Sequence, residues 1–358
     1  MTAIILLNWN GFRDTIACLG SLFACLRQDF TWMVADNGST DDSVREITSW
    51  LKRNDKDFLF LEEGEDPDKG LEPGSGVVYS LRENHGFAKG NNLGIALMEK
   101  LCEKNGREKP DHYLLLNNDT LVEPDFLVKL EDFAARNPRY AALTPQIRYA
   151  DPDDRVWNCG GKMFFGLRKY LYGDKPFRSI REKGHIDMNL ITGCALFAKR
   201  ELLGHPDDWL RRKSEHYAKT PVSPTDSTDL LTNRFFFGEE DFDFSLRMQE
   251  RKRKMACVLD SVIYHKLGSA REKLKKKAQT HIHYLNRFVD VRQHWGNPVK
   301  FMTWKILYAP YIMMIFMKSG NGFGASFKET SEIIRRSGKL DAISKETFLS
   351  YFNQAKEK

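Results

Sequence analysis

Short apolar runs alternate with amphipathic stretches along the first third of the chain. The runs at 4–7, 32–35, 77–81 and 113–116 have the length and composition of buried strands, and each is followed by apolar residues at helical spacing. Strands that alternate with helices are typical of a mostly parallel sheet with helices packed on its faces. The pattern therefore predicts an α/β fold with a mostly parallel, Rossmann-like sheet flanked by helices.

The pattern changes beyond residue 150. Mixed β segments come first, then a polar stretch from His205 to Asn233, and then helices rich in aromatic and basic residues. The most apolar window, Ile306 to Met317, contains Pro310 and is shorter than the ~20 residues that a membrane-spanning helix needs. We therefore expect a C-terminal helical extension that does not span a bilayer.

Polar residues follow each of the four predicted strands. In open parallel sheets, ligands bind at the carboxyl ends of the strands, so a site is expected where these ends meet. The four segments are Asn8-Trp9-Asn10-Gly11, Asp36 to Asp41, Asn84 to Ala88, and Asn117 to Thr120.

Asn117 and Asp119 lie two residues apart, directly after the strand at 113–116. Side chains at this spacing on an extended segment point to the same side. A carboxylate and a carboxamide placed in this way can hold a hard cation, Mg²⁺ or Mn²⁺, which bridges phosphates and stabilises the charge of a leaving diphosphate. The alternative is a turn that only caps the following helix.

An acidic run precedes a predicted helix late in the chain. Glu239, Glu240, Asp241 and Asp243 fall within five residues, after an aromatic run. The dipole at a helix N-terminus favours ionised carboxylates, and an ionised carboxylate at the bottom of a cleft can take the proton from an attacking hydroxyl. The alternative is an acidic helix cap without chemistry.

Two further strand ends each carry one candidate. His265 follows a strand predicted at 258–264 and precedes a Gly-Ser loop with many cations, a setting that could complete a metal site; a lone histidine is more often a packed residue. Asp36 follows the second strand and could accept a hydrogen bond from N3–H of uracil or thymine. The same turn could also cap the helix that begins near Asp42.

Charge and cysteine content narrow the class of protein. Lys and Arg total 55 against 49 Asp and Glu, and the net charge of +6 is too weak a bias to indicate a nucleic-acid partner. The six cysteines form no C-x-x-C pair and no regular spacing, which argues against a zinc site and against a disulfide framework. The N-terminus has no signal-peptide pattern. We therefore expect a cytoplasmic protein with reduced cysteines.

Basic and aromatic residues near the C-terminus suggest a membrane surface. The cations from Lys266 to Lys277 and the aromatic, Met-rich segment from Phe301 to Met317 together fit anionic headgroups or a lipid-diphosphate acceptor. This would place the protein at the inner face of the cell membrane. The alternative is that these helices pack back on the rest of the protein.

Taken in order, these segments carry a resemblance to a known family. The chain resembles glycosyltransferase family 2, and within it the branch of bacterial rhamnosyltransferases. The resemblance covers roughly residues 1 to 270 and rests on Leu7-Asn8-Trp9-Asn10, Asp36 to Asp41, Asn84 to Gly94, Leu116 to Thr120, Thr192-Gly193-Cys194-Ala195, and Gly238 to Arg247.

The resemblance implies a GT-A fold and an inverting, metal-dependent transfer from a UDP-sugar or dTDP-sugar, with dTDP-rhamnose among the donors. The acceptor would be a glycan or a polyprenyl-diphosphate-linked saccharide in cell-surface polysaccharide synthesis. A GT-A domain would cover 1–270, with a nucleotide-sugar half at 1–125 and an acceptor half at 126–270, followed by the extension at 271–358. The long polar stretch before Asn233 would be an acceptor-recognition loop.

The resemblance also implies roles for single residues. Asp36 would bind the base, Glu240 and Asp241 would be the catalytic pair, and Mg²⁺ or Mn²⁺ would be held by Asn117, Asp119 and His265. Asn117 departs from the family's metal-binding motif, which has Asp at this position, and the metal site has one charge fewer. The remaining residues implied to bind the nucleotide sugar are Asn8, Trp9, Asn10, Asn84, Gly86, Lys89 and Asn118.

Two other functions fit parts of the pattern. A nicotinamide-dependent oxidoreductase would need a G-x-G-x-x-G turn after a strand, and the glycines from Gly86 to Gly94 do not have this spacing. A binding protein that keeps the nucleotide-sugar fold without catalysis would not need Glu240 and Asp241, and a transfer assay with Mn²⁺ separates it from an enzyme.

Overall fold

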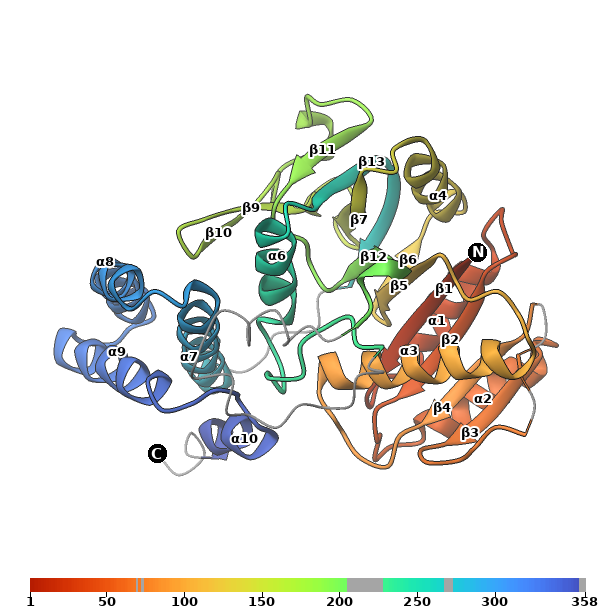
Figure 1. Cartoon of the computed structure of the whole chain (residues 1–358), viewed down its shortest axis with the longest axis horizontal. Helices are drawn as coiled ribbons and strands as arrows, with labels where there is room; N and C mark the ends of the chain where they lie inside the picture. Colours follow the sequence, from red (N-terminus) through yellow and green to blue (C-terminus); the bar gives the residue numbers. More distant parts are fainter. Residues whose placement is uncertain (69, 72–73, 205–227, 267–272, 354–358) are drawn as a thin grey trace.

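The structure is a computed structural model, and it describes residues 1–68, 70–71, 74–204, 228–266 and 273–353. Most of the polar stretch before Asn233, and residues 267–272 of the basic segment, therefore lie outside the described residues. One large sheet crosses the molecule, and Figure 1 shows the helices α7 to α10 gathered beside it, at the end away from α2 and β3.

The N-terminal part of the sheet is parallel. Its strands lie in the order β5-β1-β2-β4-β3. Four of them contain the predicted runs: β1 (Thr2–Asn8), β2 (Thr31–Asp36), β4 (Gly76–Ser80) and β5 (His112–Asn117). The sequence analysis missed β3 (Phe58–Glu62), a partly exposed edge strand whose apolar run, Phe58 to Leu61, is short.

Helices cover both faces of this parallel part. Alternate residues of β1 point to opposite faces, so Ile4 and Leu6 pack with α1 (Phe12–Phe23), α2 (Ser43–Arg53) and α4 (Phe126–Arg136). Ala3 and Ile5 face α3 (Phe87–Lys104) and α6 (Glu240–Glu250) on the other side. The sheet thus has an apolar layer on each face, and because the five strands are parallel, their carboxyl ends lie at one edge.

The remaining strands make the sheet mixed. Antiparallel β12 (Ala195–Lys199) lies between β5 and β7 (Tyr140–Tyr149), and β13 (Lys254–His265) runs parallel to β7. The other strands of the sheet are β11 (His185–Met188), β6 (Thr120–Val122) and β8 (Val156–Asn158). A separate hairpin is formed by β9 (Gly161–Phe164) and β10 (Leu167–Tyr170).

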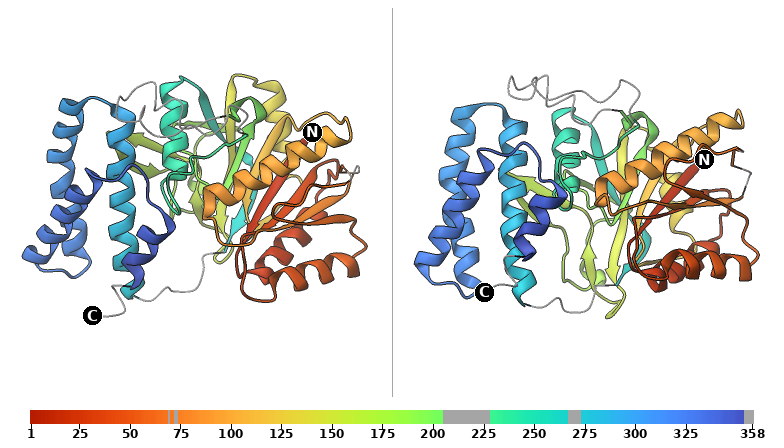
Figure 2. Two further views of the ribbon diagram at one scale, coloured as in Figure 1. Left: turned by 60° about the horizontal axis from the view of Figure 1, so that its bottom comes forward. Right: turned by 90° about the horizontal axis from the view of Figure 1, so that it is seen from below.

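Four helices follow the sheet, as expected for the C-terminal extension. They are α7 (Lys273–Trp295), α8 (Pro298–Lys318), α9 (Phe323–Ser337) and α10 (Lys345–Asn353). They form a layer next to α6 in all three views (Figures 1 and 2). Phe242 and Leu246 of α6 share an apolar cluster with Phe288 and Trp304, so the helical layer and the sheet part have a common core.

Two further findings concern the cysteines and the length of the helices. All six cysteines are free and buried, which fits the absence of a disulfide framework. None of the helices within the described residues combines the length and the apolar character that crossing a bilayer would require.

Candidate active site

A network of amides and hydroxyls joins the ends of β1, β2 and β5. The Asn8 side-chain amide donates to Asp36 Oδ2 over 2.6 Å, and the Ser39 hydroxyl donates to the same oxygen over 2.7 Å. Asn118 Nδ2 donates to Thr15 Oγ1 over 2.9 Å and lies 3.3 Å from Asn8 Oδ1. Three of the residues predicted to bind the nucleotide sugar, Asn8, Asp36 and Asn118, are therefore brought together.

Asp36 is 1% exposed, and its carboxylate is part of the turn itself. Besides the two hydrogen bonds to Oδ2, the Ser39 backbone amide donates to Oδ1 over 2.9 Å. Both interpretations of Asp36 thus depend on the same turn, which the carboxylate holds together. Base binding by Asp36 stays a prediction.

A second set of hydrogen bonds connects β2 to the start of α3. The buried Asn37 amide donates to Asn84 Oδ1 and to the Gly86 carbonyl, each over 3.1 Å, and its Oδ1 accepts from the His85 backbone. Gly86 has φ +84°, and a Cβ there would lie 2.0 Å from the carbonyl oxygen of Phe236. Glycine at this position lets the turn touch the segment that leads into the acidic run.

The other predicted nucleotide-sugar residues line the outside of this edge. Trp9 is 56% exposed, and Asn10 and Lys89 are also exposed. The Asn10 side chain accepts a hydrogen bond from the Thr40 backbone over 2.8 Å, so it ties the ends of β1 and β2 together. Trp9 and Lys89 are free to meet a ligand from solvent.

Asp119 and His265 meet at the end of β13. This strand pairs with β6, which places His265 opposite Thr120, and His265 Nε2 lies 3.1 Å from Asp119 Oδ1. Among the described residues, Asp119 Oδ1 and His265 Nδ1 are buried atoms without a hydrogen-bond partner. Buried polar atoms without a hydrogen bond are costly, and two metal-ligand side chains that meet in this way, through Asp119 Oδ1 and His265 Nε2, fit a cation site. Asn117 ends β5 on the same segment and is half-buried.

The acidic run begins α6, and its four carboxylates have different surroundings. Glu239 has φ +80° and is buried against Arg287, whose Nη2 donates to Oε1 over 3.1 Å, and against His283, whose Nδ1 lies 2.9 Å from the same oxygen. Burial opposes the ionised form, but the charges of Arg287 and His283 hold the pKa of Glu239 well below its usual range. Glu239 is thus an ion-pair partner of α7.

Asp243 is bound even more completely. It accepts hydrogen bonds from Arg234 over 2.6 Å and from Arg247 over 2.8 Å, and His294 Nε2 lies 2.9 Å from Oδ1. Burial disfavours ionisation, yet these neighbours lower the pKa of Asp243. Asp290 of α7 accepts from the same Arg234 nitrogen over 3.0 Å. Asp243 therefore joins α6 to α7.

Asp243, Asp290 and His294 are close enough to suggest a metal site, with one ligand atom from each inside 4.8 Å. However, Arg234 bridges the two carboxylates, and a guanidinium at that position repels a cation. Burial lowers the pKa of His294, but Asp290 and Asp243 outweigh it and raise this pKa to about 9, so the ring carries a charge. We assign this cluster to the packing of α6 on α7.

The two predicted catalytic residues behave differently from their neighbours. Burial and the adjacent Asp241 raise the pKa of Glu240 to about 8, and Glu240 Oε2 has no hydrogen-bond partner among the described residues. Burial also raises the pKa of Asp241, against the lowering effect of Arg168 on β10. Perturbed carboxyl groups of this kind are typical of functional sites.

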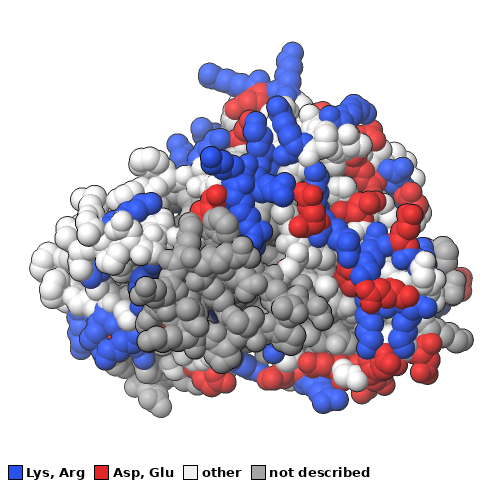
Figure 3. Space-filling model, in the orientation of Figure 1, with Lys and Arg blue, Asp and Glu red and all other residues white. Residues whose placement is uncertain are grey.

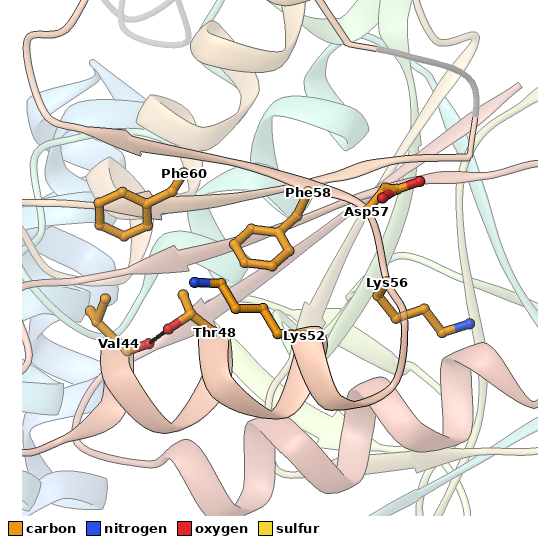
Figure 4. A pocket seen from close by; sticks show the side chains of 7 residues that line it. All are labelled: Val44, Thr48, Lys52, Lys56, Asp57, Phe58 and Phe60. Carbon is orange, nitrogen blue, oxygen red and sulfur yellow. Dashed lines mark hydrogen bonds between the residues drawn. The ribbon is translucent and has the colours of Figure 1, made fainter.

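A shallow groove lies away from these residues. It is lined by residues of α2 and of the edge strand β3, among them Thr48, Lys52, Phe58 and Phe60, and Figure 4 shows them facing one another across it. The groove borders the start of β3 and not the carboxyl ends of the strands. It contains none of the predicted site residues.

Comparison with known proteins decides the family. The sequence model of the family described as "Glycosyltransferase like family 2" matches residues 82–282, more than half of the chain. The chain belongs to this glycosyltransferase family. No curated protein matches the sequence. A solved structure, the mannosyltransferase PcManGT from Pyrobaculum calidifontis in complex with GDP-Man and Mn²⁺, has 12% identity and a TM-score of 0.47, with 93% of this chain and 84% of that chain covered. A likeness at this level says nothing about the donor or metal of this chain.

The family assignment settles the class of fold and activity. The mixed sheet flanked by helices is the GT-A fold, and the protein is a glycosyltransferase, not an oxidoreductase. The matched segment includes Asn84, Asp119, Glu240-Asp241 and His265, and it leaves out Asn8 and Asp36. The family match therefore does not bear on Asn8 and Asp36, and only the hydrogen bonds described above connect these two residues to the site of this glycosyltransferase.

The sequence analysis missed the residues that hold the acidic run of the glycosyltransferase. His283, Arg287, Asp290 and His294 all lie on α7, and Arg234 precedes the run. A signal for the first four was present, because polar residues spaced by three or four positions mark one face of a helix. A row of polar and charged side chains on one face of an otherwise apolar helix indicates that this face packs against charged groups.

Proposed function

We propose that this glycosyltransferase is an inverting enzyme that uses a UDP-sugar or dTDP-sugar donor, with dTDP-rhamnose as the candidate favoured by the resemblance to the rhamnosyltransferase branch. The acceptor is a glycan or a polyprenyl-diphosphate-linked saccharide used for cell-surface polysaccharide. The enzyme works in the cytoplasm, at the inner face of the membrane. The catalytic GT-A domain is residues 1–270, and the helices of 271–358 complete it.

One observation carries the proposal. Asp119 and His265 meet at a sheet edge where strand ends converge, with Asp119 Oδ1 buried 3.1 Å from His265 Nε2 and without a hydrogen bond, and Asn117 lies on the same segment. Carboxylate and amide oxygens suit Mg²⁺ or Mn²⁺, and the imidazole would be the further ligand. When bound there, the cation would neutralise the charge that develops on the departing diphosphate. Asp119, His265 and Asn117 would hold it.

Asp241 is the proposed base. It stands in the first turn of α6, half-buried, whereas the two flanking acids Glu239 and Asp243 are held by arginines. An ionised Asp241 takes the proton from the acceptor hydroxyl, whose oxygen forms the new bond to the anomeric carbon as the bond to the diphosphate breaks on the opposite face. Glu240, with its raised pKa, stays protonated at neutral pH and adds no competing charge.

The donor base is proposed to reach Asp36 at the end of β2. Asp36 Oδ1 accepts one hydrogen bond, from the Ser39 amide, and a carboxylate oxygen can accept another. N3–H of uracil or thymine would supply that second hydrogen, whereas cytosine presents a lone pair there. Because Asp36 is buried, base binding also requires that the turn at 38–41 moves. Asn8, Asn118 and Asn84 would orient the nucleotide, with Trp9, Asn10, Gly86 and Lys89 around them.

A binding panel tests this proposal. Thermal shifts are measured with UDP-, dTDP-, GDP- and CDP-sugars, each with Mn²⁺ or with a chelator. We expect stabilisation by a UDP- or dTDP-sugar that depends on Mn²⁺, and its loss in Asp119→Ala. Asp132→Ala, exposed on α4, is the matched control and should bind like the wild type.

Two results would contradict the proposal. Stabilisation by a CDP-sugar, without any by UDP- or dTDP-sugars, would refute the assignment of the base. Donor turnover that yields a product with retained anomeric configuration, read by NMR, would refute inversion. Donor binding without any transfer to saccharide acceptors would favour the non-catalytic binding protein.

A further inference from the structure

The outer face of α8 is apolar over its whole length. Ile306 and Leu307 are 64% and 62% exposed, and the face continues in both directions along the helix. Contiguous exposed apolar surface of this kind marks a site of interaction. The other exposed apolar side chains of α8 are Val299, Met302, Tyr311, Met314 and Met317, and Phe323 and Phe327 follow at the start of α9.

The opposite face of α8 is firmly packed. Trp304, Tyr308, Ile312 and Phe316 recur every four residues and are buried against α7 and α9. The Trp304 indole also donates a hydrogen bond to the Phe165 carbonyl in the β9–β10 hairpin over 2.9 Å. The helix therefore holds its outer face in a fixed direction. The alternative drawn from the sequence, that these helices pack back on the rest of the protein, therefore holds for this face, and contact of the outer face with a membrane stays a prediction.

The charges of α8 have one sign. The helix contains Lys300, Lys305 and Lys318 and no Asp or Glu. Lys300 and Lys318 lie near its two ends, so the apolar face has a cation at each end. The left edge of Figure 3, where Figure 1 places α8 and α9, accordingly shows white and blue atoms.

We propose that the outer face of α8 docks on an anionic membrane surface, with the helix lying along the interface. An apolar face with lysines at its ends is the pattern of an interfacial helix, in which the apolar side chains enter the acyl boundary and the lysines meet anionic headgroups. A second copy of the chain is a poorer occupant. Two antiparallel copies of α8 would bring Lys300 of one near Lys318 of the other, and these like charges repel.

The docking surface also suggests how a lipid-linked acceptor reaches the site, a step that rests on the proposed function. Trp304 touches the β9–β10 hairpin, and Arg168 of this hairpin acts on the carboxylates of Glu239 and Asp241. Arg287 donates to the Gly166 carbonyl at the hairpin turn over 2.6 Å and also binds Glu239. A membrane on the outer face of α8 would thus be separated by the width of this helix, about 10 Å, from the hairpin that borders the acidic run.

Vesicle binding tests the docking surface without any need for activity. The full chain is mixed with vesicles of 30 mol% phosphatidylglycerol in phosphatidylcholine, or of phosphatidylcholine alone, and the bound fraction is measured by flotation. We expect binding to the anionic vesicles that weakens at high salt. The double variant Ile306→Gln/Leu307→Gln should bind at least ~10-fold more weakly, because it removes two apolar anchors.

Matched control variants distinguish binding through this surface from non-specific vesicle binding. Leu26→Gln changes a residue that is 75% exposed in the loop after α1, and it should leave vesicle binding unchanged. Lys300→Glu/Lys318→Glu should weaken binding at low salt by about fivefold for each lysine, as expected for a cation near an anionic surface. Lys52→Glu, exposed on α2, should have a much smaller effect.

The possible outcomes either support or overturn the proposal. Equal binding to both kinds of vesicle, or no binding to either, overturns it. A wild-type dimer in light scattering that Ile306→Gln/Leu307→Gln converts to a monomer assigns the face to a second copy and also overturns it. Donor-induced thermal shifts in the same variants should stay at the wild-type value, so a failure of the docking surface is distinguishable from a failure of the proposed glycosyl transfer.

Discussion

The two halves of the candidate site are built from different chemistry. At the ends of β1, β2 and β5, neutral amides and hydroxyls surround one carboxylate, and their hydrogen bonds join segments next to the strands. At the start of α6, buried carboxylates meet arginines and histidines, several of them brought from α7. The first half depends on hydrogen bonds between neutral groups, the second on buried ion pairs.

This difference indicates which carboxylates are held in ion pairs and which can accept a proton from an acceptor. Breaking a buried ion pair costs far more than losing one neutral hydrogen bond, because it leaves a charge without a partner. Glu239 and Asp243 are therefore fixed by their partners. Asp241 has no ion-pair partner within 4.0 Å among the described residues, which leaves it available to an acceptor. The following predictions test this division.

The largest expected effect is a loss of turnover when the proposed base, Asp241, is replaced. Asp241→Asn should lower turnover by ~10²- to 10⁴-fold, the usual loss when a positioned general base is removed. Donor binding and the free energy of unfolding should stay close to wild type, because this side chain holds no ion pair with any residue that the structure describes. Transfer assays, donor-induced thermal shifts and urea unfolding measure the three quantities.

The pH dependence gives a second readout for Asp241. Burial raises its pKa, so wild-type kcat/KM should fall on acidification at a higher pH than an exposed aspartate would give. Asp132→Asn is the control. Near-normal turnover of Asp241→Asn would place the base elsewhere, with Glu240 and Glu239 as the next candidates.

The next effect is on stability at Asp243. Asp243→Asn leaves Arg247 and Arg234 without this buried carboxylate and should lower the free energy of unfolding by about 3–5 kcal/mol at neutral pH. The pKa of Asp243 is lowered in the folded protein, so its contribution is present above the usual carboxyl pKa and is lost as the pH falls below it. The difference between wild type and variant should therefore shrink on acidification.

Glu240→Gln is the contrasting variant for Asp243. Because the pKa of Glu240 is raised to about 8, this residue is protonated at pH 6, and a neutral amide of the same shape should change stability there only slightly. Urea unfolding at pH 6 and pH 7 compares the two. Equal destabilisation by Asp243→Asn and Glu240→Gln would contradict the distinction between carboxylates of the acidic run that are held in ion pairs and those that are not.

The smallest effect is expected in the neutral half. Asn37→Ala removes the hydrogen bonds to Asn84, Gly86 and His85 and should cost about 1–3 kcal/mol of unfolding free energy. Asn54→Ala, which loses one exposed hydrogen bond to the Trp50 carbonyl, should cost less than about 1 kcal/mol. A loss at Asn37 as large as that at Asp243 would remove the contrast between the two halves.

Much of the fold was predictable because buried parallel strands are continuous apolar runs. β1, β2, β4 and β5 were located from such runs, and the helices between them from their apolar spacing. The order of β7, β12 and β13 was not predictable, because pairing between distant strands depends on tertiary packing that leaves little local pattern. The exposed edge strand β3 was missed for the reason given above.

The candidate site was predictable where it follows strand ends. Asp119 and His265 were expected at one metal site, and the structure brings their side chains to 3.1 Å; metal binding itself stays a prediction. The acidic run was found from its composition, but the separate roles of its members were not. Their pKa values depend on Arg287 and His294, which only the folded chain brings next to Glu239 and Asp243.

The segment just before the acidic run forms a short parallel bridge with the C-terminal part of the chain. Phe235 pairs with Ile343, and the Ile343 amide donates to the Arg234 carbonyl over 2.7 Å. During synthesis the ribosome releases the chain from its N-terminus, so the sheet can form while α9 and α10 are still missing. Ile343 emerges only after the whole sheet and the helices α6 to α9 have been synthesised. The acidic run therefore obtains these backbone neighbours later than the sheet on which it packs is made.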